Sequence, residues 1–175
     1  VLYKAYTQSA IVVSGGPSFS KQVQLLKHYR HQFIIICAGS TINSLIAEGI
    51  EPDYVVTIDG GEPNYRHFKE LKLENARIVY TMQNHPRVRD SFKKPGYVVE
   101  LAGFPALSKY RKKVLKVEVP QFFGGASVAH VAFSFAAYIT TGAIALIGQD
   151  VAYTDNLTHA RTNRLAREID EKFIV

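Results

Sequence analysis

The sequence predicts an α/β fold in which a mostly parallel sheet lies between two layers of helices. Short apolar runs alternate along the chain with segments whose apolar residues recur at helical spacing, the pattern of strands joined by helical crossovers. Several runs are apolar throughout, which is typical of strands covered on both faces. With 47% hydrophobic and 21% charged residues, the composition is that of a folded protein and not of a disordered one. The length of 175 residues suits a single domain, 1–175.

The first strand is expected at the apolar run that ends at Val13, and the turn after it reads Ser-Gly-Gly-Pro-Ser. A helix follows, because Phe19, Val23 and Leu26 recur at helical spacing. Glycines in the turn let the backbone take a positive φ and leave room for a ligand. The first turn of the helix presents unpaired N–H groups and a partial positive charge, which suit a phosphate. Ser18 can cap this helix or donate to the same anion. The alternative is an ordinary tight turn that binds nothing.

The later elements continue the alternation of strands and helices. Further strands are expected at 33–37, 54–58, 77–82, 97–101, 115–119 and 143–147, the last of them buried. Helices are expected from Ser40 to a left-handed C-cap at Gly49, at 63–71, at 86–92, and from about residue 126 to a C-cap near 140–142. Residues 103–113 fit neither pattern, and the polar tail at 158–172 is expected to be part loop and part helix.

Residues 128–148 form a stretch that is long and apolar enough to span a bilayer. Thr140, Thr141 and Gly142 interrupt it where a helix would end and a turn would follow. A buried helix followed by a strand is therefore favoured over a membrane span. Nothing at the start of the chain resembles a signal peptide. Cys37, the single cysteine, excludes an internal disulfide and fits a reducing, cytoplasmic compartment.

The chain is basic, with a formal net charge of +6 and a pI near 9.4. Part of this charge is clustered, at Lys109, Arg111, Lys112, Lys113 and Lys116. Such a run could contact nucleic acid, acidic lipid or an acidic partner. Few aromatic residues lie among these charges, and no nucleic-acid-binding signature is present. A solvated surface is favoured, and neither nucleic acid nor a membrane is expected as a partner.

Ligands of parallel α/β sheets bind beyond the carboxyl ends of the strands. The residues that follow the expected strands are mostly small, polar or acidic, and they include Ser40. These residues are expected to meet at one edge of the sheet: 15–18, 39–40, 59–62, 83–85 and 148–150. The helix that opens after Gly124 and Gly125, with Ser127 in its first turn, could bring a second helix dipole to this edge.

Asp59 stands at the end of the strand expected at 54–58. An aspartate in this position can hold a ribose hydroxyl, a metal or a proton, or it can cap the turn at Gly60 and Gly61. The segment from Asp59 to Glu62 is not the Asp-x-Asp motif of many metal-dependent sugar transferases. No cluster of His, Asp and Glu shows metal-ligand spacing. A tightly bound metal is therefore not indicated.

A dense polar segment follows the last expected strand and includes Gln149, Asp150, Tyr153, Thr158 and His159. Loops this rich in hydrogen-bonding residues are more often binding sites than plain connectors. His159, with an ordinary pKa near 6.5, could accept a proton from an acceptor hydroxyl. The alternative is a structural or solvated histidine.

Five motifs together carry a resemblance to a known family. In order along the chain they are GGPS, GIEPDYVVTIDGGEPNYRHF, GGASVAHVAF, GQDVAYT and THA, and the match extends from about residue 10 to residue 160. They resemble the core domain of the motility-associated factor family, which is linked to the glycosylation of flagellin with nonulosonic acids. The same superfamily includes the archaeal 6-hydroxymethylpterin diphosphokinases, the MptE-like domains. The Gly-Pro-Ser turn is also similar to that of bacterial sialyltransferases, which bind CMP-sialic acid there.

The resemblance implies a Rossmann-like, sialyltransferase-like domain that binds a nucleotide-sugar. On this basis the phosphate turn is assigned to Gly15, Gly16, Pro17 and Ser18. A nucleotide or sugar contact is assigned to Asp59, and the ligand side is completed by Gly125, Ser127, Gln149, Asp150 and His159. Ser40 and Tyr153 are added as binding residues because they follow expected strands. Phe19 and Val151 stand where leucine is common in the family. Members are generally longer, with flanking domains, so the chain is expected to be one transferase-like domain of a longer protein.

The function expected from the resemblance is transfer of a nonulosonic acid from a CMP-sugar to protein hydroxyls such as those of flagellin. No tightly bound cofactor is expected, and His159 or Asp150 would deprotonate the acceptor hydroxyl. One alternative is a pterin diphosphokinase, which would use ATP and Mg²⁺ with Asp59, Glu62 or Asp150 as ligands. The other alternative is a non-catalytic nucleotide-binding domain.

Overall fold

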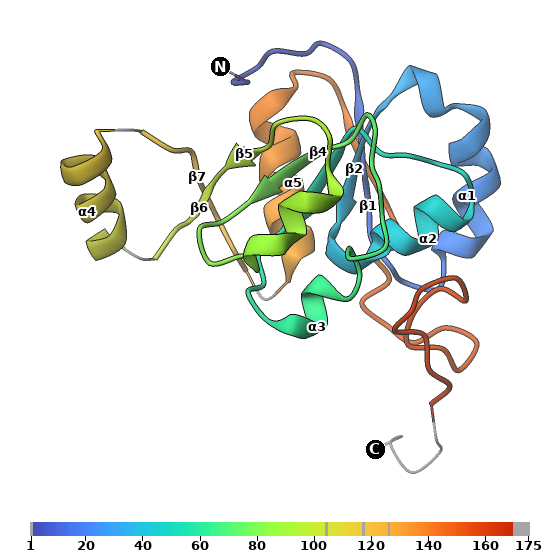
Figure 1. The fold of residues 1–175 in the computed structure, drawn as a ribbon. Coiled ribbons are helices and arrows are strands. Elements are labelled where there is room, and N and C mark those ends of the chain that lie inside the picture. Colours follow the sequence, from blue (N-terminus) through green and yellow to red (C-terminus); the bar gives the residue numbers. More distant parts are fainter. Residues whose placement is uncertain (1, 104, 117, 126, 170–175) are drawn as a thin grey trace.

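The computed structural model describes residues 2–103, 105–116, 118–125 and 127–169. Its centre is a parallel sheet of six strands in the order β5-β4-β3-β2-β1-β8 (Figure 1). The strands are β1 (Ala10–Val13), β2 (Ile34–Ala38), β3 (Tyr54–Thr57), β4 (Arg77–Tyr80), β5 (Tyr97–Val98) and β8 (Ile144–Ile147). Helices cover both faces of the sheet. The predicted α/β fold class is confirmed.

One face of the sheet packs against helices α1 (Phe19–His28), α2 (Ile42–Ala47) and α3 (Glu62–Tyr65). Strand side chains alternate between the faces, so Val13 and Cys37 point to this side. They meet Phe19 from α1, which is fully buried, and Leu45 from α2. The left-handed turn at Gly49 follows α2 with a φ of +74°, as predicted.

The opposite face packs against the apolar helix α5 (Val128–Ile139). Val12 and Ile36 point to this side and meet Phe135, which is 1% exposed. Among the described residues, no helix combines the length and the apolar character that a membrane crossing requires. The stretch 128–148 instead divides into α5 and β8, as expected. The expectation that β8 is buried is wrong, because β8 is an edge strand and Leu146 is 49% exposed.

Short 3₁₀ segments complete the connections: Arg30–Gln32, Gly39–Thr41 and Pro86–Ser91. The last of these corresponds to the helix predicted at 86–92. The helix predicted at 63–71 is much shorter, because α3 ends at Tyr65 and irregular turns follow. The tail at 158–169 contains no helix, and residues 170–172 of that prediction lie outside the described residues.

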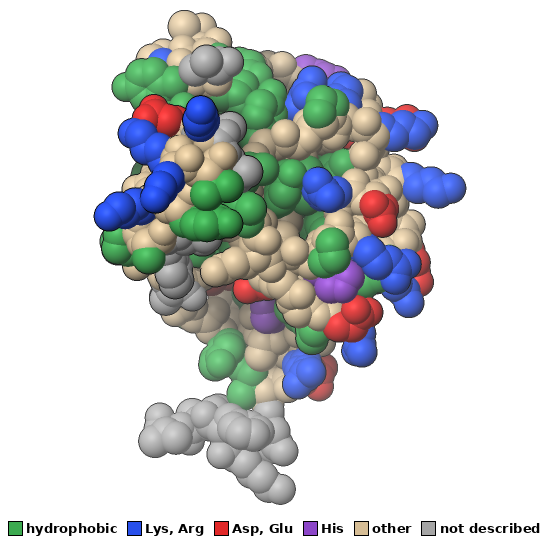
Figure 2. All heavy atoms as spheres, turned by 60° about the vertical axis from the view of Figure 1, so that its left-hand side comes forward, with side chains coloured by type: hydrophobic (Ala, Val, Ile, Leu, Met, Phe, Trp, Pro, Cys, Tyr) green, Lys and Arg blue, Asp and Glu red, His purple; other side chains and the backbone are tan. Residues whose placement is uncertain are grey.

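The segment expected as one strand at 97–101 divides between two sheets. β5 extends the main sheet, whereas β6 (Glu100–Leu101) pairs in parallel with β7 (Gln121–Phe122). None of the described residues at 115–119 belongs to a strand, so the strand expected there is wrong. Residues 103–113, which fitted no pattern, contribute to helix α4 (Pro105–Leu115). Helix α4 stands away from the sheet (Figure 1), and basic and apolar side chains gather on this side of the molecule (Figure 2).

A buried ion pair ties α4 to β6. Arg111 and Glu100 are 6% and 5% exposed, and Arg111 Nε donates to Glu100 Oε1 at 2.8 Å. Ser108 and Gln121 also donate to the same carboxylate. The hydrogen bonds from Arg111 outweigh the opposing effect of burial and lower the pKa of the Glu100 carboxyl to about 2. A carboxylate satisfied in this way can remain charged inside the protein.

The core around α1 gives the first testable prediction. Phe19→Ala should lower the free energy of unfolding by about 3–5 kcal/mol, because it leaves a cavity under the helix. Leu25→Ala is the matched control, since Leu25 lies on the same helix and is 64% exposed; its effect should stay within about 0.5 kcal/mol. Equal losses in chemical denaturation would contradict the assigned orientation of α1.

Candidate functional site

A cleft of about 620 Å³ opens at the carboxyl ends of β1 and β8. The crossover from β1 leads through α1 on one face, whereas β8 is reached through α5 on the other. Such a reversal leaves a crevice in which α/β proteins hold their ligands. Nine of the residues singled out from the sequence line this cleft: Gly15, Gly16, Ser40, Ser127, Gln149, Asp150, Tyr153, Thr158 and His159. Pro17, Ser18, Asp59 and Gly125 are not among its lining residues.

The two positions after β1 require glycine because other parts of the chain approach their backbone closely, and not because the backbone takes an unusual angle there. The expectation of positive φ in this turn is wrong, since neither Gly15 nor Gly16 has it. A Cβ on Gly16 would lie 2.6 Å from the carbonyl oxygen of Gly148 and 2.8 Å from Asp150 Cγ. A Cβ on Gly15 would lie 2.6 Å from Asn163 Nδ2. The space freed by these glycines is therefore filled by the protein's own C-terminal segment.

Asp150 occupies the N-terminus of α1. Its Oδ2 accepts a hydrogen bond from the backbone N–H of Ser18 at 2.7 Å, and its Oδ1 accepts one from the Ser18 hydroxyl. A carboxylate here interacts favourably with the partial positive charge of the helix end. The N-terminus of α1, which was expected to bind a phosphate, is thus occupied by the Asp150 side chain.

Other donors face the cleft from two directions. Ser40 and Thr41 approach from the 3₁₀ turn that follows β2, and Ser127 and Val128 from the first turn of α5. The N-terminal N–H groups of a helix have no partner within the helix. The Ser127 side chain makes no capping hydrogen bond and lies 3.3 Å from His130 Nδ1. The start of α5 can therefore donate to an anionic group in the cleft.

His159 is half-buried at the edge of the cleft. Its Nδ1 lies 3.1 Å from the Thr158 hydroxyl oxygen, and the next residue, Ala160, donates its N–H to the Gly15 carbonyl at 2.9 Å. Burial lowers the pKa of the His159 imidazole, and a hydrogen bond that the ring donates to the Leu165 backbone opposes this shift only in part. The imidazole is therefore neutral at neutral pH and able to accept a proton.

Sequence reasoning missed Ser14, whose hydroxyl donates to Gln149 Oε1 at 2.9 Å. This bond joins the ends of β1 and β8. Because the Gln149 oxygen is engaged, its amide N–H groups remain to donate to a ligand. Asn163 was also missed: it is 4% exposed and packs beside Gly15, and its buried Nδ2 has no hydrogen-bond partner among the residues that the structure describes. No sequence signal distinguished these two residues from other polar residues.

Asp59 lies apart from this group. Its side chain is exposed, and its carbonyl oxygen accepts hydrogen bonds from the amides of Asn64 and Asn84 at 2.7 and 3.2 Å. Glu62 contacts His85 instead, with an Oε2–Nε2 distance of 3.3 Å. Gly125 adopts a φ of +50° beside His130. Within the described residues, no group of three or more metal-ligating side chains is present.

These features define an α/β domain with a cleft where the order of its parallel strands reverses. Residues 2–156 match the family model described as 6-hydroxymethylpterin diphosphokinase MptE-like, and the chain belongs to this family. Its fold is similar to that of the MAf glycosyltransferase from Magnetospirillum magneticum AMB-1, with a TM-score of 0.68 and 25% identity over 85% of this chain. The chain spans 24% of that protein's length. A comparison with curated proteins gives no match. The family resemblance inferred from the motifs is confirmed.

The contact between Ser18 and Asp150 gives the second prediction. In a double-mutant cycle of Ser18→Ala and Asp150→Ala, the free energies of unfolding should show a coupling of about 1–2 kcal/mol, because the bond is charge-assisted and caps a helix. The control cycle combines Ser18→Ala with Asp90→Ala, because the structure does not pair these two residues. Their effects on the free energy of unfolding should be additive. Additivity in both cycles would argue against this capping role.

Proposed function

We propose that this chain is the donor-binding and catalytic domain of a glycosyltransferase that transfers a nonulosonic acid from a CMP-sugar to a protein hydroxyl, such as those of flagellin. The observation that supports it is the cleft between β1 and β8, lined by hydroxyls, amides and a half-buried histidine. The similarity to a MAf glycosyltransferase favours sugar transfer over other chemistry in such a cleft.

We assign the proton transfer to His159. Both carboxylate oxygens of Asp150 already accept hydrogen bonds from Ser18 at the start of α1, so this side chain is engaged within the protein. In the proposed step the acceptor oxygen forms a bond to the anomeric carbon, and the bond from that carbon to the phosphate oxygen of CMP breaks. The acceptor's proton passes to the His159 imidazole, and CMP leaves as a phosphate monoester.

The start of α5, together with Ser40 and Thr41, would hold the phosphate of CMP. A nucleoside monophosphate carries fewer charges than a diphosphate, so helix N–H groups and hydroxyls can stabilise it as a leaving group. Tyr153 lines the same cleft and is 69% exposed. An exposed aromatic ring at the rim is suited to stack on the cytosine base.

The third prediction concerns His159. His159→Ala in the full-length protein should reduce kcat by about 10²- to 10⁴-fold, the range expected for loss of a general base. His28→Ala is the control, because His28 is exposed at the end of α1 and should leave kcat unchanged.

The pH profile tests the same role independently. Because burial lowers the pKa of His159, the acid limb of kcat/KM should lie below the ordinary histidine value of 6.5. Activity should be retained as the pH rises above that limb, where the imidazole is neutral. An unchanged kcat in His159→Ala would refute the assignment.

The family name favours a second candidate, a diphosphokinase that uses ATP and Mg²⁺. This reaction would use carboxylates near the phosphates to bind the metal. Of the expected ligands, Asp150 lines the cleft but is occupied by Ser18, and Asp59 and Glu62 lie outside the lining. The arrangement of donors therefore favours the metal-independent reaction.

The fourth prediction separates the two candidates by calorimetry. CMP should bind without added metal, and Tyr153→Ala should weaken it by about tenfold through loss of base stacking. Tyr110→Ala removes an equally exposed ring, 65% against 69%, from α4 and should leave binding unchanged. Preferential binding of ATP with Mg²⁺ would instead support the diphosphokinase, and CMP binding without turnover by the full-length protein would indicate a non-catalytic domain.

A further inference from the structure

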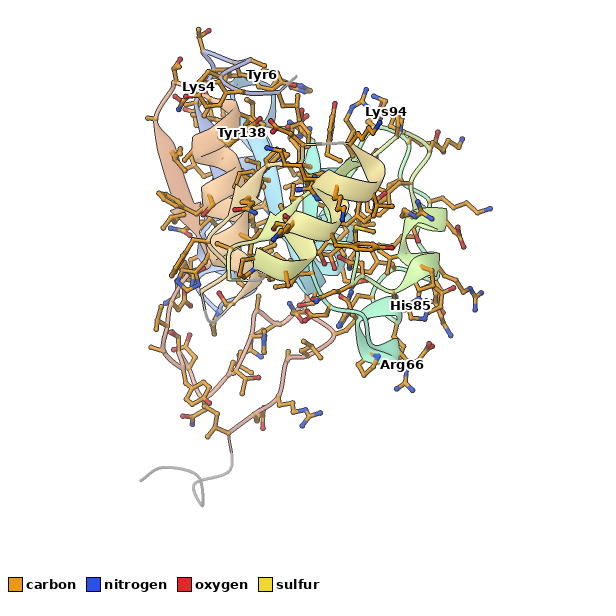
Figure 3. All side chains as sticks on the ribbon, turned by 90° about the vertical axis from the view of Figure 1, so that its left-hand side faces the viewer. Lys4, Tyr6, Arg66, His85, Lys94 and Tyr138 are labelled. Atoms are coloured by element: carbon orange, nitrogen blue, oxygen red, sulfur yellow. The ribbon has the colours of Figure 1, made fainter. Side chains whose placement is uncertain are left out.

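A second cleft, of about 440 Å³, lies at the opposite end of the sheet, where β2, β3 and β4 begin. None of its lining residues lines the first cleft. Figure 3 shows Tyr6 and Lys94, two of its residues, at one end of the molecule, and His85 and Arg66 at the other. We refer to it as the amino-end cleft, with walls that include Tyr6, Arg30, Asp53, Tyr54, Arg77 and Lys94.

One cation and one carboxylate of the amino-end cleft neutralise each other. Arg30 Nη2 and Nη1 donate to Asp53 Oδ1 and Oδ2 at 3.0 and 3.1 Å. The remaining Arg30 donors bind backbone carbonyls, including that of Glu51 at 2.9 Å. Asp53 Oδ2 also accepts a hydrogen bond from the N–H of Ile35 at 2.7 Å. Arg30 and Asp53 therefore form an ion pair that carries no net charge with which to bind a ligand.

Two further cations in this cleft are not neutralised. Arg77 Nη1 donates to the Pro95 carbonyl at 3.2 Å, and Lys94 Nζ donates to Asn75 Oδ1 at 3.4 Å. Within the described residues, neither has a carboxylate within 4.0 Å. Both side chains are half-buried. Two cations that line one cleft without a counter-charge can together bind an anion through charge-assisted hydrogen bonds.

Two tyrosine hydroxyls stand beside these cations. Tyr6 and Tyr54 share a hydrogen bond of 2.7 Å between their hydroxyl oxygens, which uses one of their two protons. Burial, followed by the bond to Tyr6, raises the pKa of Tyr54, so its hydroxyl stays protonated. Tyr54 is the direct neighbour of Arg77 in the pairing of β3 with β4. One of the two hydroxyl protons therefore remains available to donate to a ligand in this cleft.

We propose that the amino-end cleft binds a small polyanion with at least two negative charges, held by Arg77, Lys94 and the paired hydroxyls of Tyr6 and Tyr54. Two unneutralised cations match two anionic groups, and the guanidinium can bind paired oxygens of a phosphate or carboxylate in a bidentate manner. The cleft volume lies within the range of small-molecule sites. This site is separate from the cleft between β1 and β8, so its failure would leave the proposed transferase function untouched.

The test is a titration of the full-length protein with inorganic pyrophosphate, followed by calorimetry and by the amide chemical shifts. The shifts of Tyr54, Arg77 and Lys94 should move, and a double variant, Arg77→Gln with Lys94→Gln, should bind at least tenfold more weakly. The control double variant, Lys21→Gln with Lys69→Gln, removes the same charge from exposed positions outside the cleft and should bind within twofold of the unmodified chain. Citrate in place of pyrophosphate distinguishes a carboxylate ligand from a phosphate ligand.

Three outcomes would overturn the proposal: shifts confined to the residues of the first cleft, equal weakening in both double variants, or unchanged binding in the Arg77 and Lys94 variant. Circular dichroism checks that the variants are folded. If the double variant does not fold, pyrophosphate binding is measured with the single variant Lys94→Gln instead. Lys94 donates to a side chain, so its replacement leaves the backbone hydrogen bonds intact. That single variant should weaken pyrophosphate binding by about threefold or more.

Discussion

The parallel pairing of β8 with β1 determines where this protein can hold a ligand. β1 lies between β2 and β8, with Val13 opposite Cys37 on one side and Ile147 on the other. The Ser14 N–H donates to the Ile147 carbonyl, and the Gly16 N–H to that of Gly148, both at 2.8 Å. Gly148 can cross so close to Ser14 because it has no Cβ and adopts a φ of +67°. Without this pairing, the segment from Gln149 to His159 would have no reason to lie beside the turn after β1.

The same pairing decides how charge is distributed around the cleft. It delivers Asp150 to the N-terminus of α1, where the carboxylate takes the position that a bound anion would occupy. The positive end of α1 is thereby satisfied within the protein. At the start of α5, on the other face of the sheet, Ser127 makes no capping bond, and no carboxylate of the described residues is bonded there. Of these two helix ends, the start of α5 is therefore the one whose N–H groups are not already bonded to a carboxylate of the described residues.

Local patterns were enough to locate the strands of the main sheet, most of which are apolar throughout. They could not predict which strands pair. Residues 97–101 were expected to form one strand, yet Val98 and Glu100 belong to different sheets, because the partners of each are set by distant segments. The site shows the same division. The sequence pointed to Gln149 and His159, whereas Ser14 and Asn163 acquire their roles from contacts across more than a hundred residues.

The segment that carries His159 is also the least regular wall of the cleft. Val151 has a φ of +51°, a strained angle for a β-branched residue, and Asp155 and Asn156 also have positive φ. Contacts with other elements hold this segment in place: Gln149 accepts from Ser14, Asp150 accepts from Ser18, and the Ala160 N–H donates to the Gly15 carbonyl. Each of these contacts reaches β1 or the turn that leads into α1. The shape of this wall of the cleft therefore depends on its bonds to β1 and α1, and not on regular secondary structure within the segment itself.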